Sequence, residues 1–277
     1  MLGAIIGDIV GSRFEFHPIK SKRFDLFFGD GFKNYDKMTI EDFNTKCRFT
    51  DDTVMTLAVC EALMDCDGDY TYLSELAIYH MQDLGKRYPL AGYGGKFNQW
   101  LRSENPLPYN SFGNGSAMRI SAVPYFAKDI EQLKELTYKV TAVTHNHPEG
   151  LKGAEAIAIC IWFARQGKSK EFIKEYIEKN YYKLDFNYDE FVRAYKFDET
   201  CQGSVPQSIF AFLISDSYED TIRTAISMGG DADTMACISG AIAEAYYGLP
   251  KEIEKEMYRF LSPELKEIVE DFKHFVG

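Results

Sequence analysis

The sequence has no C-x-x-C pair and no cluster of cysteines with histidines. Its six cysteines are scattered, and Cys60, Cys160 and Cys237 stand among Ala, Val and Ile, where a free thiol behaves as a small apolar residue. No segment reaches the ~18 consecutive apolar residues that a membrane helix needs. Residues 1–6 lack the basic start of a signal peptide. We therefore expect a reduced, soluble, cytoplasmic protein with no membrane partner.

Basic residues are also fewer than acidic residues. The chain has 31 Lys and Arg residues against 42 Asp and Glu residues, which gives a formal net charge of −11. A general nucleic-acid binder needs a basic footprint, and short clusters such as residues 20–23 are typical of solvated surface. The sequence therefore predicts no general nucleic-acid binding.

Strand-like alternation of apolar and polar residues is scarce, and helical spacing dominates. Residues 53–64 are apolar on one wide face, whereas residues 151–164 and 235–247 are apolar almost all round, as in buried helices. Helices are expected over six segments: 53–64, 151–164, 205–214, 221–228, 235–247 and about 262–274. The stretches 18–47 and 86–113 are rich in Gly, Pro, Asn and aromatic residues and are predicted to be long loops that carry ligands. We expect one compact, multi-helix, all-α domain over residues 1–277.

Two acidic clusters stand directly before predicted helices. Thr50-Asp51-Asp52-Thr53 precedes one helix, and Asp231-Ala232-Asp233-Thr234 precedes another. Helix capping explains one Asp in each cluster, since a carboxylate suits the positive end of a helix. Two carboxylates per cluster fit a hard cation such as Mg²⁺, which prefers oxygen ligands and would offset their repulsion. Both explanations remain open from the residues alone.

Two glycine-rich segments and one histidine pair are further candidates. Residues 112–119 (FGNGSAMR) precede a helical run. Backbone N–H groups there, with Arg119 nearby, suit a phosphate, and a tight loop is the alternative; the segment matches neither the Walker pattern nor G-x-G-x-x-G. Residues 91–97 form a second glycine-rich loop with aromatic side chains; a mobile surface turn is the alternative. His145 and His147 lack further zinc ligands at suitable spacing, which favours capping, packing or stacking on a base.

Five segments, taken together and in their order along the chain, resemble the ADP-ribosylglycohydrolase family. That family includes the dinitrogenase-reductase-activating glycohydrolases and the ADP-ribosyl-arginine and ADP-ribosyl-serine hydrolases. The segments are Gly3–Asp8 with Gly11-Ser12 and Phe14-Glu15; 50–53; 113–119; Thr144-His145 with Pro148; and 229–234. The resemblance implies the compact all-α fold of that family and a site with two divalent cations, Mg²⁺ or Mn²⁺. The metal ligands that it implies are Thr50, Asp51, Asp52, Asp231, Asp233 and Thr234. The candidate substrate contacts are Tyr93, Gly113, Asn114, Gly115, Ser116, Met118 and His145.

The activity that the resemblance implies is hydrolysis at the anomeric carbon of the ribose distal to adenine. Glu15, Asp52 and Asp231 are the candidate catalytic residues, with Glu15 as a gate or general base. The substrate would be an ADP-ribosylated protein or small molecule. An arginine-like guanidine acceptor is favoured by the negative charge, with Tyr93 and Phe97 as stacking partners, and serine is possible. The alternatives are a metal-dependent phosphohydrolase of nucleotide diphosphates and a non-catalytic ADP-ribose-binding module.

Overall fold

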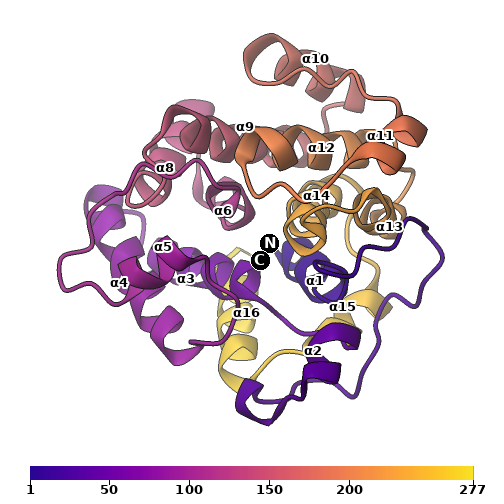
Figure 1. The fold of residues 1–277 in the computed structure, drawn as a ribbon. Coiled ribbons are helices and arrows are strands. Elements are labelled where there is room, and N and C mark those ends of the chain that lie inside the picture. Colours follow the sequence, from indigo (N-terminus) through magenta and orange to yellow (C-terminus); the bar gives the residue numbers. More distant parts are fainter. Residues whose placement is uncertain (277) are drawn as a thin grey trace.

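A computed structural model describes residues 1–276 as a bundle of helices joined by loops, without a β-strand in that range (Figure 1). The prediction of an all-α fold is therefore confirmed. The helices, in chain order, are α1 (Leu2–Gly11), η1 (Tyr35–Lys37), α2 (Ile40–Thr45), α3 (Asp51–Asp65), η2 (Tyr70–Tyr72), α4 (Leu73–Arg87), α5 (Gly95–Leu101), α6 (Gly115–Met118), α7 (Val123–Phe126), α8 (Ile130–Thr141), α9 (Pro148–Arg165), α10 (Lys170–Asn180), α11 (Tyr188–Ala194), α12 (Cys201–Leu213), α13 (Tyr218–Met228), α14 (Ala232–Tyr247), α15 (Lys251–Tyr258) and α16 (Pro263–Val276).

The six predicted helices correspond to α3, α9, α12, α13, α14 and α16, and most begin two to four residues earlier than predicted. The first turns of α3 and α13 are capped by side chains. The Thr50 hydroxyl accepts a hydrogen bond from the Asp52 N–H at 3.3 Å, and Ser217 caps α13 through the Asp220 N–H at 3.1 Å. Most residues of the added turns are polar or small, so apolar spacing does not reveal them, although Tyr218 in the first turn of α13 is buried.

Both predicted loops contain a short helix. In residues 18–47, Thr39 and Asp42 cap each other's backbone N–H groups at the start of α2. In residues 86–113, α5 forms because Phe97, Trp100 and Leu101 share one face and bury it, with α5 packed beside α4. Because glycines precede these three residues, the segment has a loop-like composition, and the sequence did not predict a helix there.

Helix α14 lies inside the bundle, in contact with α1, α9, α12 and α13 (Figure 1). The contact with α1 is close because Gly3, Gly7 and Gly11 recur every four residues on the face of α1 that meets α14. A Cβ atom on Gly7 would lie 2.1 Å from the carbonyl oxygen of Ala236. Only glycine permits this backbone contact.

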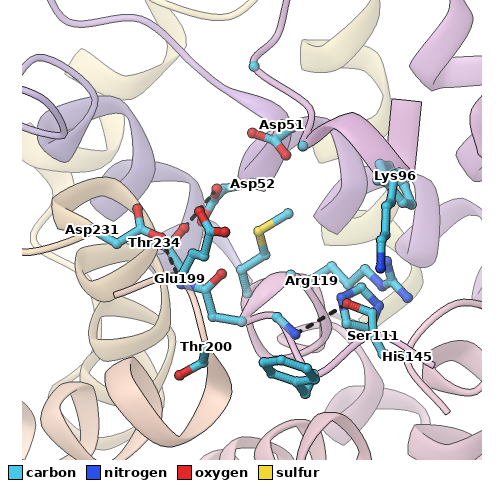
Figure 2. Close-up of a pocket in the computed structure, with 18 of the residues that line it drawn as sticks. Asp51, Asp52, Lys96, Ser111, Arg119, His145, Glu199, Thr200, Asp231 and Thr234 are labelled. Carbon is cyan, nitrogen blue, oxygen red and sulfur yellow. Dashed lines mark hydrogen bonds between the residues drawn. The ribbon is translucent and has the colours of Figure 1, made fainter. Parts of the chain in front are cut away.

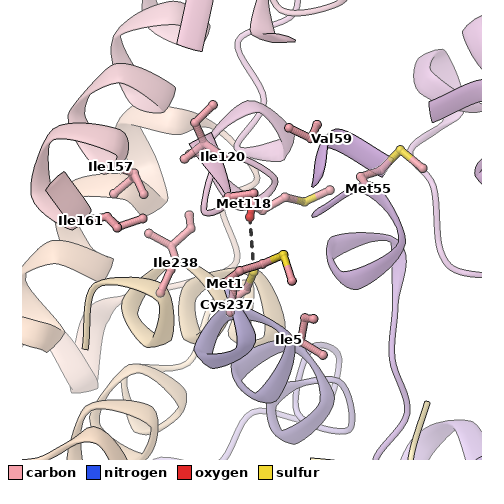
Figure 3. Packing of buried hydrophobic residues seen from close by; sticks show 14 of the residues in the cluster. Met1, Ile5, Met55, Val59, Met118, Ile120, Ile157, Ile161, Cys237 and Ile238 are labelled. Carbon is pink, nitrogen blue, oxygen red and sulfur yellow. Dashed lines mark hydrogen bonds between the residues drawn. The ribbon is translucent and has the colours of Figure 1, made fainter. Parts of the chain in front are cut away.

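The apolar core is continuous across the bundle. Figure 3 shows Met1, which precedes α1, beside Cys237 of α14, and Ile157 of α9 beside Ile238 of α14. All six cysteines are buried and unpaired. None of the helices in residues 1–276 combines the length and apolar character that crossing a membrane requires. The core holds α1 and the N-terminal ends of α3 and α14 together, and these three elements carry the acidic residues.

Candidate metal centre and ligand cavity

Acidic side chains from three helices converge. Asp8 of α1, Asp52 of α3 and Asp233 of α14 each place a carboxylate oxygen within 4.8 Å of the others. Glu15, Asp231 and Asp233 form a second group, in which carboxylate oxygens also lie within 4.8 Å of one another. The two acidic clusters of the sequence therefore meet in space, and Asp8 and Glu15 join them.

Asp8 is held by the first turn of α3. Its Oδ2 accepts hydrogen bonds from the backbone N–H of Thr50 at 2.9 Å and of Thr53 at 3.1 Å. The hydroxyl of Thr50 donates to Oδ1 at 2.7 Å, and the hydroxyl of Thr53 donates to Oδ2. Sequence reasoning assigned Asp8 no role; the available signal was one carboxylate within the otherwise apolar residues 2–11.

A glycine turn presents Asp231. Gly229 and Gly230 have φ angles of +77° and +76°, a region that glycine occupies without strain. A Cβ atom on Gly230 would lie 2.3 Å from the ring of Tyr195, so space also requires glycine there. The side-chain amide of Asn114 donates to Asp231 Oδ2 at 2.7 Å, which connects the 112–119 segment to the acidic centre.

Thr234 links two of the acids at the start of α14. Its hydroxyl donates to Asp52 Oδ2 at 3.2 Å, and its N–H donates to Asp233 Oδ1 at 3.0 Å. Asp52 Oδ1 is buried without a hydrogen-bond partner among residues 1–276. A buried carboxylate oxygen without a partner is costly, and it is available to a cation.

The acids raise one another's pKa values. Burial, followed by the charge of Asp233, raises the pKa of Glu15 to about 9, and burial raises the pKa of Asp231 to about 6. Burial and neighbouring carboxylates raise the pKa values of Asp52 and Asp233 well above the usual range. In the described part of the chain, none of these four acids forms an ion pair with Lys or Arg. An oxygen-only cluster without a basic partner fits a hard divalent cation.

A cavity of about 480 Å³ opens beside the acidic centre. Figure 2 shows the acids Asp51, Asp52 and Asp231 at one end, and Lys96, Arg119 and His145 at the other. The predicted site residues that line the cavity are Glu15, Asp51, Asp52, Gly113, Asn114, Gly115, Met118, His145, Asp231, Asp233 and Thr234.

Three predicted site residues lie behind the cavity wall. Thr50 is turned to Asp8, and the Ser116 hydroxyl donates to the carbonyl of Gly150 at 2.9 Å. Tyr93 packs on Phe97 with ring centroids 5.7 Å apart, and Phe97 lines the cavity in its place. Side-chain direction, which decides these placements, is not visible in the sequence.

Several lining residues were missed by sequence reasoning. Lys96 falls within a segment recognised as a glycine-rich loop but was assigned no contact, and Arg119 was considered only as a cation near a phosphate. Phe197, Glu199 and Thr200 come from the coil before α12, which carries no motif. That coil reaches the cavity because the N–H of Asn114 donates to the carbonyl of Glu199 at 2.8 Å.

The fold and the site define an all-α protein with an acidic centre that can hold a metal beside a cavity for a small ligand. A sequence model of the ADP-ribosylglycohydrolase family matches residues 1–275. The chain therefore belongs to the ADP-ribosylglycohydrolase family, and the resemblance seen in the five segments is confirmed.

Relatives and a solved structure agree with this assignment. The chain is 26% identical to ADP-ribosylhydrolase ARH3 of Mus musculus over 311 residues, covering 90% of this chain and 83% of that protein. It is 25% identical to ADP-ribosylarginine hydrolase Tri1 of Pseudomonas putida (strain GB-1) over 281 residues, covering 92% of this chain and 72% of that protein. A structure described as an ADP-ribosylglycohydrolase-related protein complex superposes with a TM-score of 0.68 at 21% identity, over 100% of this chain and 97% of that one. The last comparison supports the fold.

Proposed function

We propose that this protein hydrolyses the glycosidic bond between ADP-ribose and an acceptor and releases free ADP-ribose. The observation that carries the proposal is the polarity of the cavity, which has carboxylates at one end and Lys96 and Arg119 at the other. Cation-bound ribose hydroxyls suit the first end, and phosphate oxygens suit donors at the second. The volume of about 480 Å³ is in the range of small-molecule sites. Family membership supports the same reaction.

Two Mg²⁺ or Mn²⁺ ions would be held by the acids at the ends of α3 and α14. Asp52, Asp231 and Asp233 offer the most direct ligand oxygens, with Thr50, Asp51 and Thr234 as the remaining candidates. A bound divalent cation supplies Lewis-acid activation of water and offsets negative charge. Asp8 supports this set from behind, because its oxygens accept hydrogen bonds that fix the first turn of α3.

In the proposed reaction, the oxygen of a water molecule bonds to the anomeric carbon while the bond from that carbon to the acceptor breaks. One proton of the water passes finally to the departing acceptor. Glu15 is the proposed base that carries this proton, and it would be ionised once a bound divalent cation offset the neighbouring carboxylate charge that helps to raise its pKa. It lies in the coil after α1, lines the cavity, and is more exposed than the buried acids Asp231 and Asp233 beside it. A carboxylate in this role is common to glycosidases.

For the acceptor, we propose an arginine-like guanidine in preference to serine. Phe16 follows Glu15 directly and stacks on Phe197 with ring centroids 6.1 Å apart, and both rings are exposed. A planar guanidinium stacks on aromatic faces and is attracted by a surplus of carboxylates. The relative Tri1 is named as an ADP-ribosylarginine hydrolase. Tyr93 packs on Phe97 and does not line the cavity, which leaves Phe16 and Phe197 as the better stacking partners.

The test supplies the protein with matched arginine-linked and serine-linked ADP-ribosyl peptides and Mg²⁺ or Mn²⁺, and identifies products by mass spectrometry. Free ADP-ribose, released faster from arginine, is expected. AMP with ribose phosphate would instead identify a phosphohydrolase, and binding without turnover would identify an ADP-ribose-binding module. Faster release from serine would overturn the acceptor assignment alone.

Variants connect the activity to the acidic centre. Asp52→Ala and Asp231→Ala should abolish turnover while the circular dichroism spectrum stays unchanged, because each removes a candidate metal ligand. Asp271→Ala, at an exposed carboxylate on α16, is the matched control and should keep full activity. Full activity with metal still bound in either of the first two variants would show that the reaction occurs elsewhere.

A further inference from the structure

A chain of three buried side chains ends at the cavity. Arg119, which follows α6, donates from Nη2 to the hydroxyl oxygen of Thr144 at 2.6 Å. That hydroxyl lies 2.7 Å from Nδ1 of His145. Arg119 is 1% exposed and His145 is 5% exposed, so solvent does not compete for these bonds.

The direction of the second hydrogen bond follows from the chemistry of the first. A guanidinium has donors only, and a threonine hydroxyl has one hydrogen. The Thr144 oxygen accepts from Arg119, and the described residues offer the Thr144 hydroxyl hydrogen no acceptor other than Nδ1 of His145, so that hydrogen is donated to Nδ1. Nδ1 is then an acceptor, and in a neutral imidazole the remaining hydrogen is on Nε2. Burial, followed by the charge of Arg119, lowers the pKa of His145 well below its usual value, so the ring is neutral at neutral pH.

Nε2 of His145 faces the glycine loop. A Cβ atom on Gly115 would lie 3.4 Å from it, and a Cβ atom on Gly113 would lie 3.7 Å from it. No hydrogen bond engages Nε2 among residues 1–276, and His145 lines the cavity. Figure 2 shows His145 with Arg119, Lys96 and Ser111 at the end of the cavity away from the acids.

The surroundings favour an anionic acceptor at this point. Lys96 is exposed and lines the cavity, and neither Lys96 nor Arg119 has a carboxylate partner in the described chain. Two cations without a counter-charge attract an anion, and a phosphate oxygen accepts hydrogen bonds without donating any at neutral pH. A nucleobase stacked on the imidazole ring would leave the Nε2 hydrogen without an acceptor.

We propose that Arg119 and Thr144 are positioning residues that hold His145 as the neutral Nε2–H tautomer, and that His145 donates this hydrogen to a phosphate oxygen of the substrate at the Gly113–Gly115 loop. The identity of the phosphate rests on the proposed function. The tautomer does not, since it is a property of the protein alone.

The first measurement is therefore made without ligand. Two-bond ¹H–¹⁵N correlation spectra of ¹⁵N-histidine protein, assigned with the His145→Gln variant, should show the Nε2–H tautomer of His145 at neutral pH. Thr144→Ser should preserve this signature, and Thr144→Val should change it to mixed tautomers, because valine cannot donate to Nδ1. A wild-type ring with hydrogen on Nδ1, or a charged ring, would overturn the proposed direction of the hydrogen bonds.

The second measurement is calorimetric binding of ADP-ribose and of adenosine, which has no phosphate. His145→Gln, whose side-chain amide can still donate, should keep the ADP-ribose Kd within a few-fold. His145→Phe should raise it by about 10- to 100-fold, which is the size of a lost hydrogen bond to a charged group. Neither variant should change a measured adenosine Kd by as much. His274→Phe, at an exposed histidine of α16, is the control and should leave both Kd values unchanged.

Two outcomes separate this proposal from the proposed function. Full affinity in His145→Phe with a loss in His145→Gln would show that the ring stacks on the base, and would overturn the donor role. Absence of ADP-ribose binding by the wild-type protein would refute the proposed function and the phosphate contact, whereas the ligand-free spectra would still decide the roles of Arg119 and Thr144.

Discussion

Replacing Gly7 by alanine tests how the packing of α1 on α14 forms the acidic centre. Gly7 immediately precedes Asp8, and its face of α1 meets the backbone of Ala236. The added Cβ atom would lie 2.1 Å from the Ala236 carbonyl oxygen and 2.3 Å from its carbonyl carbon, whereas real Cβ contacts almost never fall below 3.0 Å. The two helices must therefore separate by about 1 Å, because the contacted atoms are backbone and no rotamer can relieve them.

The magnitude follows from two opposing effects. Overpacking costs about 1–3 kcal/mol, and a backbone contact belongs at the upper end of that range. Alanine in place of glycine inside a helix returns about 1 kcal/mol. The net loss in the free energy of unfolding is then about 2 kcal/mol, or roughly 4–8 °C in Tm for a large single domain. Displacement of Asp8 by about 1 Å should lower kcat by up to about 100-fold.

Calorimetry in EDTA and an ADP-ribose release assay measure the two effects on Gly7→Ala. Gly95→Ala is the stability control. Nothing lies within 4 Å of the added Cβ atom, and Gly95 is the first residue of α5. The control should melt about 1–4 °C above wild type, because Gly→Ala at a strain-free site stabilises by about 0.4–1 kcal/mol. A Gly7→Ala protein with unchanged Tm and rate would refute the reasoning that close packing of α1 on α14 positions Asp8.

Three further predictions concern the centre and one distant ion pair. Mg²⁺ or Mn²⁺ should raise Tm through mass action, by about 2.7 kcal/mol of stability at 100 times Kd; a melting curve indifferent to EDTA and to both metals would contradict a bound cation, and Asp52→Ala should lose the effect. Glu15→Gln should lower kcat much more than it weakens ADP-ribose binding, because a base acts in the reaction step; a loss confined to affinity would reassign Glu15 to substrate binding. Burial lowers the pKa of His80, but the carboxylates of Glu61 and Asp65, which lie 3.5 Å from Nδ1 and 2.8 Å from Nε2 of its ring, outweigh it and leave the pKa above the usual 6.5. His80→Gln should therefore reduce stability most below about pH 6.5, and the difference in Tm should disappear as the pH rises through the raised folded-state pKa; a difference independent of pH would exclude the charged pair as its cause.

Much of the helical fold could be predicted because apolar spacing is a local property. Residues 151–164 and 235–247 are apolar almost all round, and both form the centres of buried helices. The predicted helices began late because most residues of their first turns are polar or small, as in α3 and α14. Helix α5 was missed because its three buried residues follow glycines in a stretch with loop-like composition.

The acidic residues at 50–53 and 231–234 were identifiable from the sequence because each cluster has more carboxylates than a helix cap needs. The direction of individual side chains was not. Tyr93 and Ser116 stand in the expected segments yet point into packed structure, whereas Lys96 and Arg119 of the same segments reach the cavity. A loop's sequence records which groups are available, and its packing decides which of them face a ligand.

Only the tertiary structure decided that Asp8 belongs to the centre. No local pattern relates Asp8 to Thr50, Thr53 or Asp233, because they are remote in sequence and on different helices. The glycine face of α1 lets that helix approach the backbone of α14, and this approach sets the position of Asp8 to within a hydrogen-bond length. The kinds of ligand atoms were therefore determined by the sequence of each segment, whereas their convergence depended on helix-to-helix distances that only the packed core specifies.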